Sequence, residues 1–184
     1  MSSQPHSYAA DDPETALKYA IQHVPAIDRV QIVEGVIDPL SPTWGHERAA
    51  GKIRDQIALT VATLGCVSGS GNLDLPGTSN WYTPDVAVVP EDPADADALP
   101  PDQTLLVVEI TSESNGDTDP VVKRRRYAEY GAPLYLVVDR QERTCTLYAE
   151  PGKFGYTSVN GPHPSGTPVR LPEPFELELD TSEF

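Results

Sequence analysis

The stretch LLVVEITSESNGDTDPVVKRRRYAEYGAPLYLVVD, residues 105–139, decides how the chain folds. Its first six residues form a nearly continuous apolar run of strand length, which is typical of a strand that is covered on both faces. Residues 119–130 predict a helix, with Asp119 at the N-cap and Gly131 just after the end. A second apolar run, Leu134–Val138, predicts another buried strand. The segment therefore predicts a strand, a helix and a second strand in the middle of an α/β domain.

The rest of the chain supplies further helices and strands around this centre. Residues 14–24 and 44–64 have apolar positions at helical spacing and predict two helices. Short extended segments bounded by Gly and Pro predict strands at residues 29–34, 36–40, 66–70, 72–75, 81–82, 85–89, 144–149, 153–159 and 169–171. We therefore expect an α/β fold with a mixed central sheet flanked by helices and with extra β-strands. We also expect one domain over residues 14–184, preceded by a flexible segment over residues 1–13.

The charge of the chain is strongly negative and unevenly placed. It has 13 Lys and Arg against 28 Asp and Glu, a net charge of −15, and 39% of its 184 residues are hydrophobic. This composition allows a packed core and argues against a protein that coats nucleic acid through a broadly basic surface. Glu91–Asp102 and Glu173–Phe184 each hold five acids and no base, so we interpret these two segments as solubility features.

Cysteine content and hydropathy indicate the compartment. Cys66 and Cys145 lie in apolar surroundings and predict buried thiols rather than a disulfide framework. The first residues, MSSQPHSYAADDPE, lack the basic region and apolar run of a signal peptide. No apolar stretch approaches the roughly 20 residues that span a bilayer. We therefore expect a cytoplasmic protein without a membrane partner.

Glu109 is the residue that most clearly indicates chemistry. It lies within LLVVEI and shares a strand face with Leu105 and Val107, where a carboxylate is costly unless a cation or hydrogen bonds compensate it. Asp85 raises the same question, because it begins the strand DVAVV just after Pro84. If the two strands are neighbours, the two carboxylates converge, and a hard divalent cation such as Mg²⁺ would relieve their repulsion.

Lys123 is the third candidate. It shares a helix face with Asp119 and Tyr127, at spacings of four residues, one turn into the helix after Glu109. Its ammonium could orient an attacking water or neutralise phosphate charge. Arg124–Arg126 extend the only dense basic cluster of the chain, as an acidic protein acting locally on a phosphate backbone would need. A solvated helix face for the basic residues and a core position for Tyr127 are the alternative interpretations.

Several motifs carry a resemblance to a known family. They are VQIVEGVIDPLSP (30–42), PDVAVV (84–89), LLVVEITSES (105–114) and DPVVKRRRYAEYGAPLYLVVD (119–139). Together they closely resemble the bacterial family often called Uma-two, described as restriction endonucleases of the PD-(D/E)xK nuclease superfamily. The resemblance covers about residues 28–150, and it implies a restriction-endonuclease-like fold and a metal-dependent endonuclease that hydrolyses DNA with Mg²⁺ or Mn²⁺.

The resemblance also implies roles for individual residues. Asp85 resembles a metal ligand, and Glu109 resembles the acidic member of the (D/E)xK element. The lysine that usually follows two residues later is absent, because Thr111 stands there. In this family the lysine looks displaced onto the following helix, which makes Lys123 the candidate for that catalytic position.

Two further positions are implied as assisting residues. Family members commonly carry Glu in the first strand where this chain has Gln31, and a neutral amide binds a metal more weakly than a carboxylate does. Glu34, three residues later, has the opposite strand parity and is a poor substitute. His46 matches a histidine that is frequent before the long helix of the family; a helix-start or core hydrogen bond is its alternative role.

Two classes of function therefore remain in view. The first is a metal-dependent endonuclease with catalytic Asp85, Glu109 and Lys123, in which Asp85 and Glu109 hold the metal and Arg124–Arg126 contact DNA phosphates. Cutting both strands of a duplex usually needs two sites, so a homodimer is one expected assembly. The second is a catalytically degenerate nuclease fold that serves as a binding or regulatory module, which Gln31 and the net charge favour. A DNA mimic is a weaker third option, because the acids are not regularly spaced.

Overall fold

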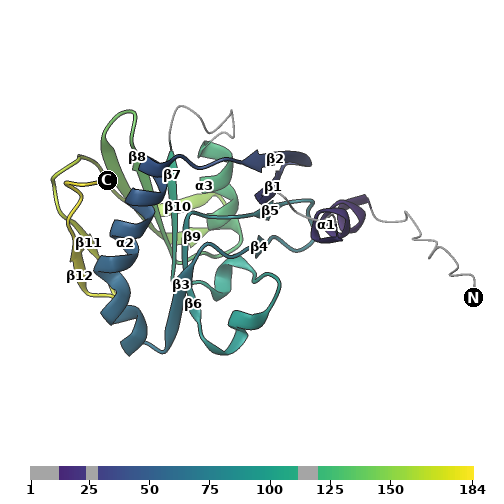
Figure 1. Ribbon diagram of the computed structural model, residues 1–184, viewed down its shortest axis with the longest axis horizontal. Helices are drawn as coiled ribbons and strands as arrows, with labels where there is room; N and C mark the ends of the chain where they lie inside the picture. The colour runs from purple at the N-terminus through teal and green to yellow at the C-terminus, as the bar shows by residue number, and fades with distance from the viewer. Residues whose placement is uncertain (1–12, 24–28, 112–119) are drawn as a thin grey trace, which may run out of the picture.

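The computed structural model describes residues 13–23, 29–111 and 120–184. Three α-helices, two 3-10 helices and twelve strands occur in these ranges, and Figure 1 shows their arrangement. In chain order they are α1 (Pro13–His23), β1 (Arg29–Val33), β2 (Val36–Leu40), α2 (Trp44–Thr63), β3 (Cys66–Gly69), β4 (Leu73–Asp74), β5 (Trp81–Tyr82), β6 (Val86–Pro90), η1 (Asp92–Asp95), η2 (Pro101–Gln103), β7 (Leu106–Thr111), α3 (Pro120–Glu129), β8 (Leu134–Asp139), β9 (Thr144–Gly152), β10 (Gly155–Pro164), β11 (Val169–Leu171) and β12 (Leu177–Leu179).

Twelve strands form three sheets rather than one. The central sheet has six strands in the order β10-β9-β8-β7-β6-β3, and β7 and β8 are its parallel pair. A four-stranded sheet, β2-β1-β5-β4, and the two-stranded β11-β12 supply the extra strands. The predicted fold class, an α/β fold with a mixed central sheet, flanking helices and additional strands, is confirmed.

Helices cover the central sheet on both faces (Figure 1). Two buried clusters of side chains lie between these layers. On one face, α2 and the β11-β12 hairpin pack on Val86, Val108 and Ile110. On the other face, α3 and the four-stranded sheet enclose a second cluster that includes Val107 and Tyr127. Alternate residues of β7 thus enter different clusters, which explains why this strand is apolar almost throughout.

Most predicted elements agree with the structure to within a few residues, and the differences lie near the C-terminus. β9 and β10 extend beyond the predicted alternation because they form one long antiparallel hairpin, in which Gly155 pairs with Gly152. The three-residue strand β12 was not predicted, since it is too short to show a period of its own. The predicted N-cap Asp119 lies outside the described residues, as does the predicted flexible segment as far as residue 12. The single domain stays a prediction.

Two simpler expectations also have outcomes. Cys66 and Cys145 are both free thiols; Cys145 is buried and Cys66 is half-buried. Burial raises the pKa of the Cys145 thiol to about 11. In the described part of the chain, no helix combines the length and the apolar character that crossing a bilayer requires.

Candidate active site

Asp85 and Glu109 lie at the same end of two neighbouring inner strands of the central sheet. β6 and β7 are antiparallel neighbours with Val86 opposite Val108, so Asp85, just before β6, lies beside Glu109 near the end of β7. The amide of Asp85 donates to the carbonyl of Val108 at 3.1 Å, which continues the ladder to this point. The strand neighbourhood on which the predicted carboxylate pair depends is therefore present.

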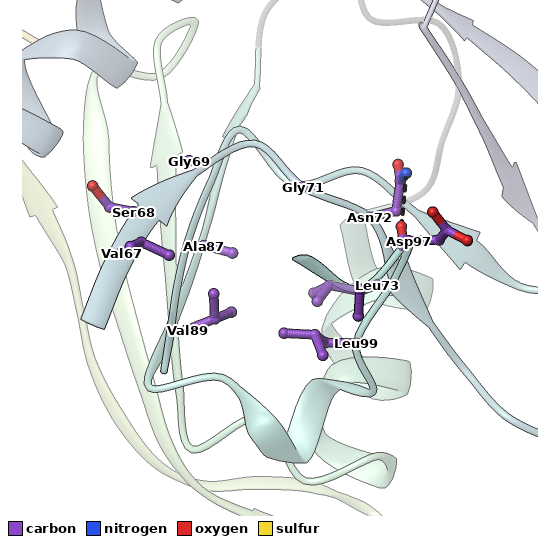
Figure 2. Close-up of a pocket in the computed structure, with 11 residues that line it drawn as sticks. Val67, Ser68, Gly69, Gly71, Asn72, Leu73, Ala87, Val89, Asp97 and Leu99 are labelled. Atoms are coloured by element: carbon purple, nitrogen blue, oxygen red, sulfur yellow. Dashed lines mark hydrogen bonds between the residues drawn. The ribbon is translucent and has the colours of Figure 1, made fainter. Parts of the chain in front are cut away.

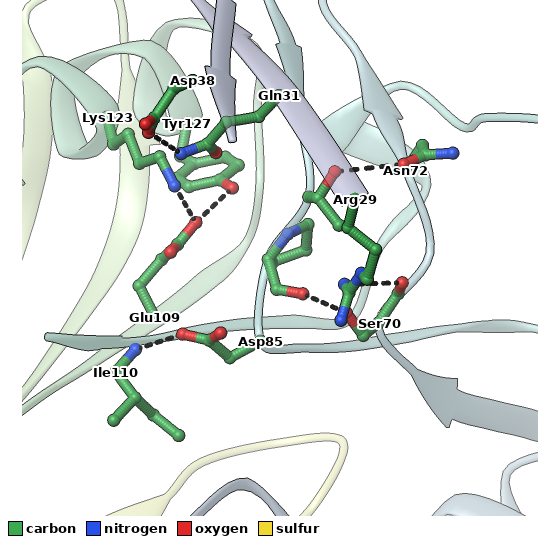
Figure 3. A network of polar contacts seen from close by, with 12 residues as sticks. Arg29, Gln31, Asp38, Ser70, Asn72, Asp85, Glu109, Ile110, Lys123 and Tyr127 are labelled. Carbon is green, nitrogen blue, oxygen red and sulfur yellow. Dashed lines mark hydrogen bonds and ion pairs between the residues drawn. The ribbon is translucent and has the colours of Figure 1, made fainter. Parts of the chain in front are cut away.

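The carboxylate of Glu109 is buried and held by two donors from α3. Lys123 Nζ lies 2.9 Å from Oε1, and the Tyr127 hydroxyl donates to the same oxygen at 2.8 Å (Figure 3). Burial raises the pKa of Glu109 above its ordinary value, and the neighbouring Asp85 adds to this, while Lys123 and Tyr127 act in the opposite direction. Among the described residues, Oε2 accepts no hydrogen bond, so it is the oxygen that remains for a ligand.

Asp85 is fixed by contacts on both of its oxygens. The backbone amide of Ile110 donates to Oδ2 at 2.6 Å, and His46 Nε2 lies 2.5 Å from Oδ1. His46 belongs to the first turn of α2, where its amide donates to the side chain of the N-cap Thr43 at 3.3 Å. The cap thus sets where α2 begins and, with it, where the His46 ring meets Asp85.

α3 brings Lys123 and Tyr127 to the site because the two residues are one turn apart on the same face. Lys123 is only 6% exposed and lies 5.6 Å from the centroid of the Tyr82 ring. Lys123 is therefore buried against Glu109 and does not lie on a solvated face of the helix. Tyr127 was interpreted mainly as a core aromatic, and it is one, yet its hydroxyl also contacts the acid; its spacing from Lys123 was the available signal.

The side chain of Gln31 extends from β1 toward Tyr127 (Figure 3), whereas Glu34 pairs with Arg126. Nε2 of Gln31 donates to Asp38 Oδ2 at 2.8 Å, whereas its Oε1 is buried without a partner among the described residues. Glu34 adopts a positive φ of 47° at the hairpin turn and pairs with Arg126 at 2.7 Å. The expectation that Glu34 cannot substitute for an acid at position 31 agrees with this placement.

The three arginines of α3 diverge. Arg124 donates to the Tyr148 hydroxyl at 3.0 Å and lies over its ring, and Arg126 is paired with Glu34 and Glu129. Arg125 is exposed. The described contacts therefore leave Arg125 as the member of the trio that is most accessible to a phosphate backbone, and the predicted role of all three stays a prediction.

The two carboxylates suit a Mg²⁺ ion that keeps water or phosphate ligands better than they suit a metal whose ligands all come from the protein. In residues 13–23, 29–111 and 120–184, no group of three or more His, Cys, Asp and Glu side chains could enclose a metal. Mg²⁺ commonly uses one or two carboxylates and completes its shell with water and substrate phosphates. The paired Asp85 and Glu109, with Oε2 of Glu109 available, match that donor set.

A separate cavity lies elsewhere and contains none of the predicted site residues. It has a volume of about 260 Å³ and lies between β3, β6 and the segment around Leu99. Figure 2 shows its mainly apolar lining, with Val67, Val89 and Leu73 turned inward and Asn72 and Asp97 at one side. The cavity therefore does not form part of the carboxylate site.

Comparison with known proteins places the chain in a family. The family model of Uma2, described as "Putative restriction endonuclease", matches residues 14–182. The chain belongs to the Uma2 family. The resemblance seen in the sequence is thereby confirmed, and the Uma2 description supports a nuclease function in general terms.

A solved structure supports the fold of this Uma2 protein. A crystal structure from Anabaena variabilis ATCC 29413, described as a "putative nuclease belonging to DUF820", has a TM-score of 0.70 and 15% sequence identity. The match covers 91% of this chain and 95% of that one. The comparison with curated proteins gave no match.

Proposed function

We propose that this protein is a metal-dependent endonuclease that hydrolyses phosphodiester bonds in DNA. The observation that carries the proposal is the placement of Asp85 and Glu109 beside each other on neighbouring strand ends, with the Lys123 ammonium 2.9 Å from Glu109. A carboxylate whose pKa is shifted by burial and by specific charged neighbours is a candidate catalytic group. Uma2 membership makes nuclease chemistry the reaction class that this arrangement serves best.

Mg²⁺ or Mn²⁺ would be held by Asp85 and Glu109. When bound, such an ion supplies Lewis acidity, which polarises the scissile phosphate and acidifies a water molecule. Asp85 is prepared for this role because His46 and the Ile110 amide fix both of its oxygens in the protein alone. A ligand held in place before binding loses little conformational freedom when the ion arrives.

Lys123 supplies positive charge where negative charge develops. Its ammonium is a three-fold donor, of which one hydrogen bond goes to Glu109, so others can orient a water or a phosphate oxygen. The Tyr127 hydroxyl holds the same Glu109 oxygen, which keeps the carboxylate fixed if Lys123 turns toward substrate.

The acidic body of the protein requires local rather than broad contact with DNA. With a net charge of −15, the affinity for a polyanion must come from the metal site and from exposed cations such as Arg125 on α3. Cutting both strands of a duplex usually needs two sites, so the proposal includes a homodimer. It also includes a cytoplasmic location, where DNA and Mg²⁺ are both present.

The test is a plasmid-nicking assay with Mg²⁺ or Mn²⁺. Asp85→Asn, Glu109→Gln and Lys123→Met should each abolish cleavage, and circular dichroism should show that the variants are folded. Glu178→Gln removes an exposed carboxylate on β12 and should cut like the wild type. Cleavage that survives in the three site variants, or a wild type that cuts neither plasmid nor single-stranded DNA, would contradict the proposal.

A catalytically degenerate binding or regulatory module is the second candidate, and Gln31 favours it. A neutral amide stands where the resembled family commonly has a carboxylate, which weakens the metal site. Such a module would bind DNA or metal without cutting. Metal binding measured by calorimetry together with absent cleavage would support this candidate, whereas cleavage by the wild type would exclude it.

A further inference from the structure

Gln31 and Asp38 form a polar pair on the β1-β2 hairpin that the proposed chemistry does not yet use. The two residues are direct cross-strand partners, so their side chains share a face. Gln31 is 2% exposed, and its Nε2 donates to Asp38 Oδ2 at 2.8 Å. The contact therefore joins a buried amide to a half-buried carboxylate.

Chemistry dictates which way the Gln31 amide faces. An ionised carboxylate only accepts hydrogen bonds, so the amide must present its nitrogen to Asp38. Oε1 then points away from Asp38, and it is buried without a partner in the described part of the chain. An unsatisfied buried acceptor costs free energy, and such a group calls for a donor or a cation.

Gln31 lies on the strand face of β1 that packs toward the second buried cluster, beside Tyr127 of the candidate site (Figure 3). Val33, two residues along the same strand face, packs in one buried cluster with Val107 and Tyr127. Val107 shares its strand face with Glu109. Figure 3 shows the Gln31 side chain reaching from β1 toward Tyr127, with Asp38 beside its amide.

We propose that Asp38 is a positioning residue: it fixes the Gln31 amide so that Oε1, at the first-strand position where the resembled family carries a metal-binding carboxylate, faces the divalent cation. The inference rests on the proposed metal site at Asp85 and Glu109. An amide oxygen is a suitable ligand for a hard cation. Carboxylates that orient a metal ligand from outside tune metal affinity in many proteins.

The pair also explains how the chain tolerates Gln at position 31. A glutamate at that position would place two carboxylates within hydrogen-bond distance of each other, and like charges that close disfavour joint ionisation. With Gln31 and Asp38, only Asp38 carries a negative charge, and Oε1 of Gln31 is directed away from it. The carboxylate that the resembled family carries at the first strand is thus replaced here by one on the neighbouring strand.

The test measures Mn²⁺ affinity by calorimetry on the full chain. Asp38→Asn should weaken Mn²⁺ binding about tenfold, because an asparagine side chain can donate to Oε1 and let the Gln31 amide rotate. Gln31→Leu should weaken it at least as much, since it removes the oxygen. The melting temperature of metal-free Asp38→Asn should stay close to that of the wild type, which a merely structural role would not predict. Asp95→Asn, an exposed acid in η1, is the matched control and should bind as the wild type does.

A double variant sharpens the test. When Gln31→Glu is combined with Asp38→Asn, the new amide on β2 donates to the new carboxylate on β1, whose other oxygen faces the site. Mn²⁺ affinity should then return to the wild-type value or exceed it. Wild-type affinity in Asp38→Asn, or no recovery in the double variant, would overturn the inference. If Asp85→Asn and Glu109→Gln abolish binding while Gln31→Leu does not, this inference fails alone; if the wild type binds no Mn²⁺, the proposed function fails with it.

Discussion

Glu109 and Lys123 form an ion pair that is almost fully removed from water, with 9% and 6% of the two residues exposed. Removing two charges from water costs several kcal/mol each, so a pair like this one contributes little net stability. Its members nevertheless depend on each other, because either one alone would be a buried charge without its opposite charge. The pair is therefore better explained by what it can do than by stability.

A double-mutant cycle tests this dependence. Lys123→Met should lower the free energy of unfolding by roughly 3 kcal/mol, because it leaves the Glu109 carboxylate buried without its cation. Combining Lys123→Met with Glu109→Gln should restore most of that loss, since no buried charge remains. Urea denaturation of the single and double variants measures both values.

Arg125→Met is the control for that cycle. It also removes a cation from α3, but from an exposed position, so it should change stability by less than about 0.5 kcal/mol. If Lys123→Met destabilises no more than Arg125→Met does, the buried pair is not coupled in the way its geometry indicates.

At the scale of elements, the sequence predicts where helices and strands lie better than it predicts what they contact. LLVVEI predicted a buried strand with an acid near its end, and helix-end signals predicted α3. The four-residue spacing then placed Lys123 and Tyr127 on one face of that helix. The contact of Gln31 with Asp38 was not predicted, because cross-strand register depends on the turn at Gly35 and on packing rather than on either residue. The pairing of Arg126 with Glu34, far away in the chain, could not be predicted because it depends on how α3 packs beside the β1-β2 hairpin.

The N-terminus of α2 links an element to the site. Thr43→Ala should lower the free energy of unfolding by about 1 kcal/mol, because it removes the acceptor for the His46 amide. Thr43→Ser keeps the hydroxyl and should retain most of the stability. Urea denaturation is the measurement, and equal losses in both variants would show that the hydroxyl does not act as a cap.

At the scale of the whole molecule, the most acidic loop lies at the opposite end of β6 and β7 from the candidate site. The loop between β6 and β7 carries five exposed acids, whereas Asp85 precedes β6 and Glu109 is near the end of β7. The length of β6, five residues, therefore lies between this loop and the site, or roughly 17 Å at the usual rise of a strand. Charge repulsion between the loop and DNA at the site thus depends on how far the field reaches through salt solution.

Ionic strength should reveal this separation. The Debye length is about 8 Å at 0.15 M salt and about 30 Å at 0.01 M. Replacing the five loop acids by amides should leave the rate of DNA cleavage unchanged at 0.15 M salt and raise it severalfold at 0.01 M, because only the longer range reaches the site; the changes are Glu91→Gln, Asp92→Asn, Asp95→Asn, Asp97→Asn and Asp102→Asn. Arg125→Gln, which removes the exposed cation of α3 that is proposed to contact DNA, should slow cleavage at both salt concentrations. A loop variant that cuts faster at both concentrations would mean that the loop contacts the substrate directly.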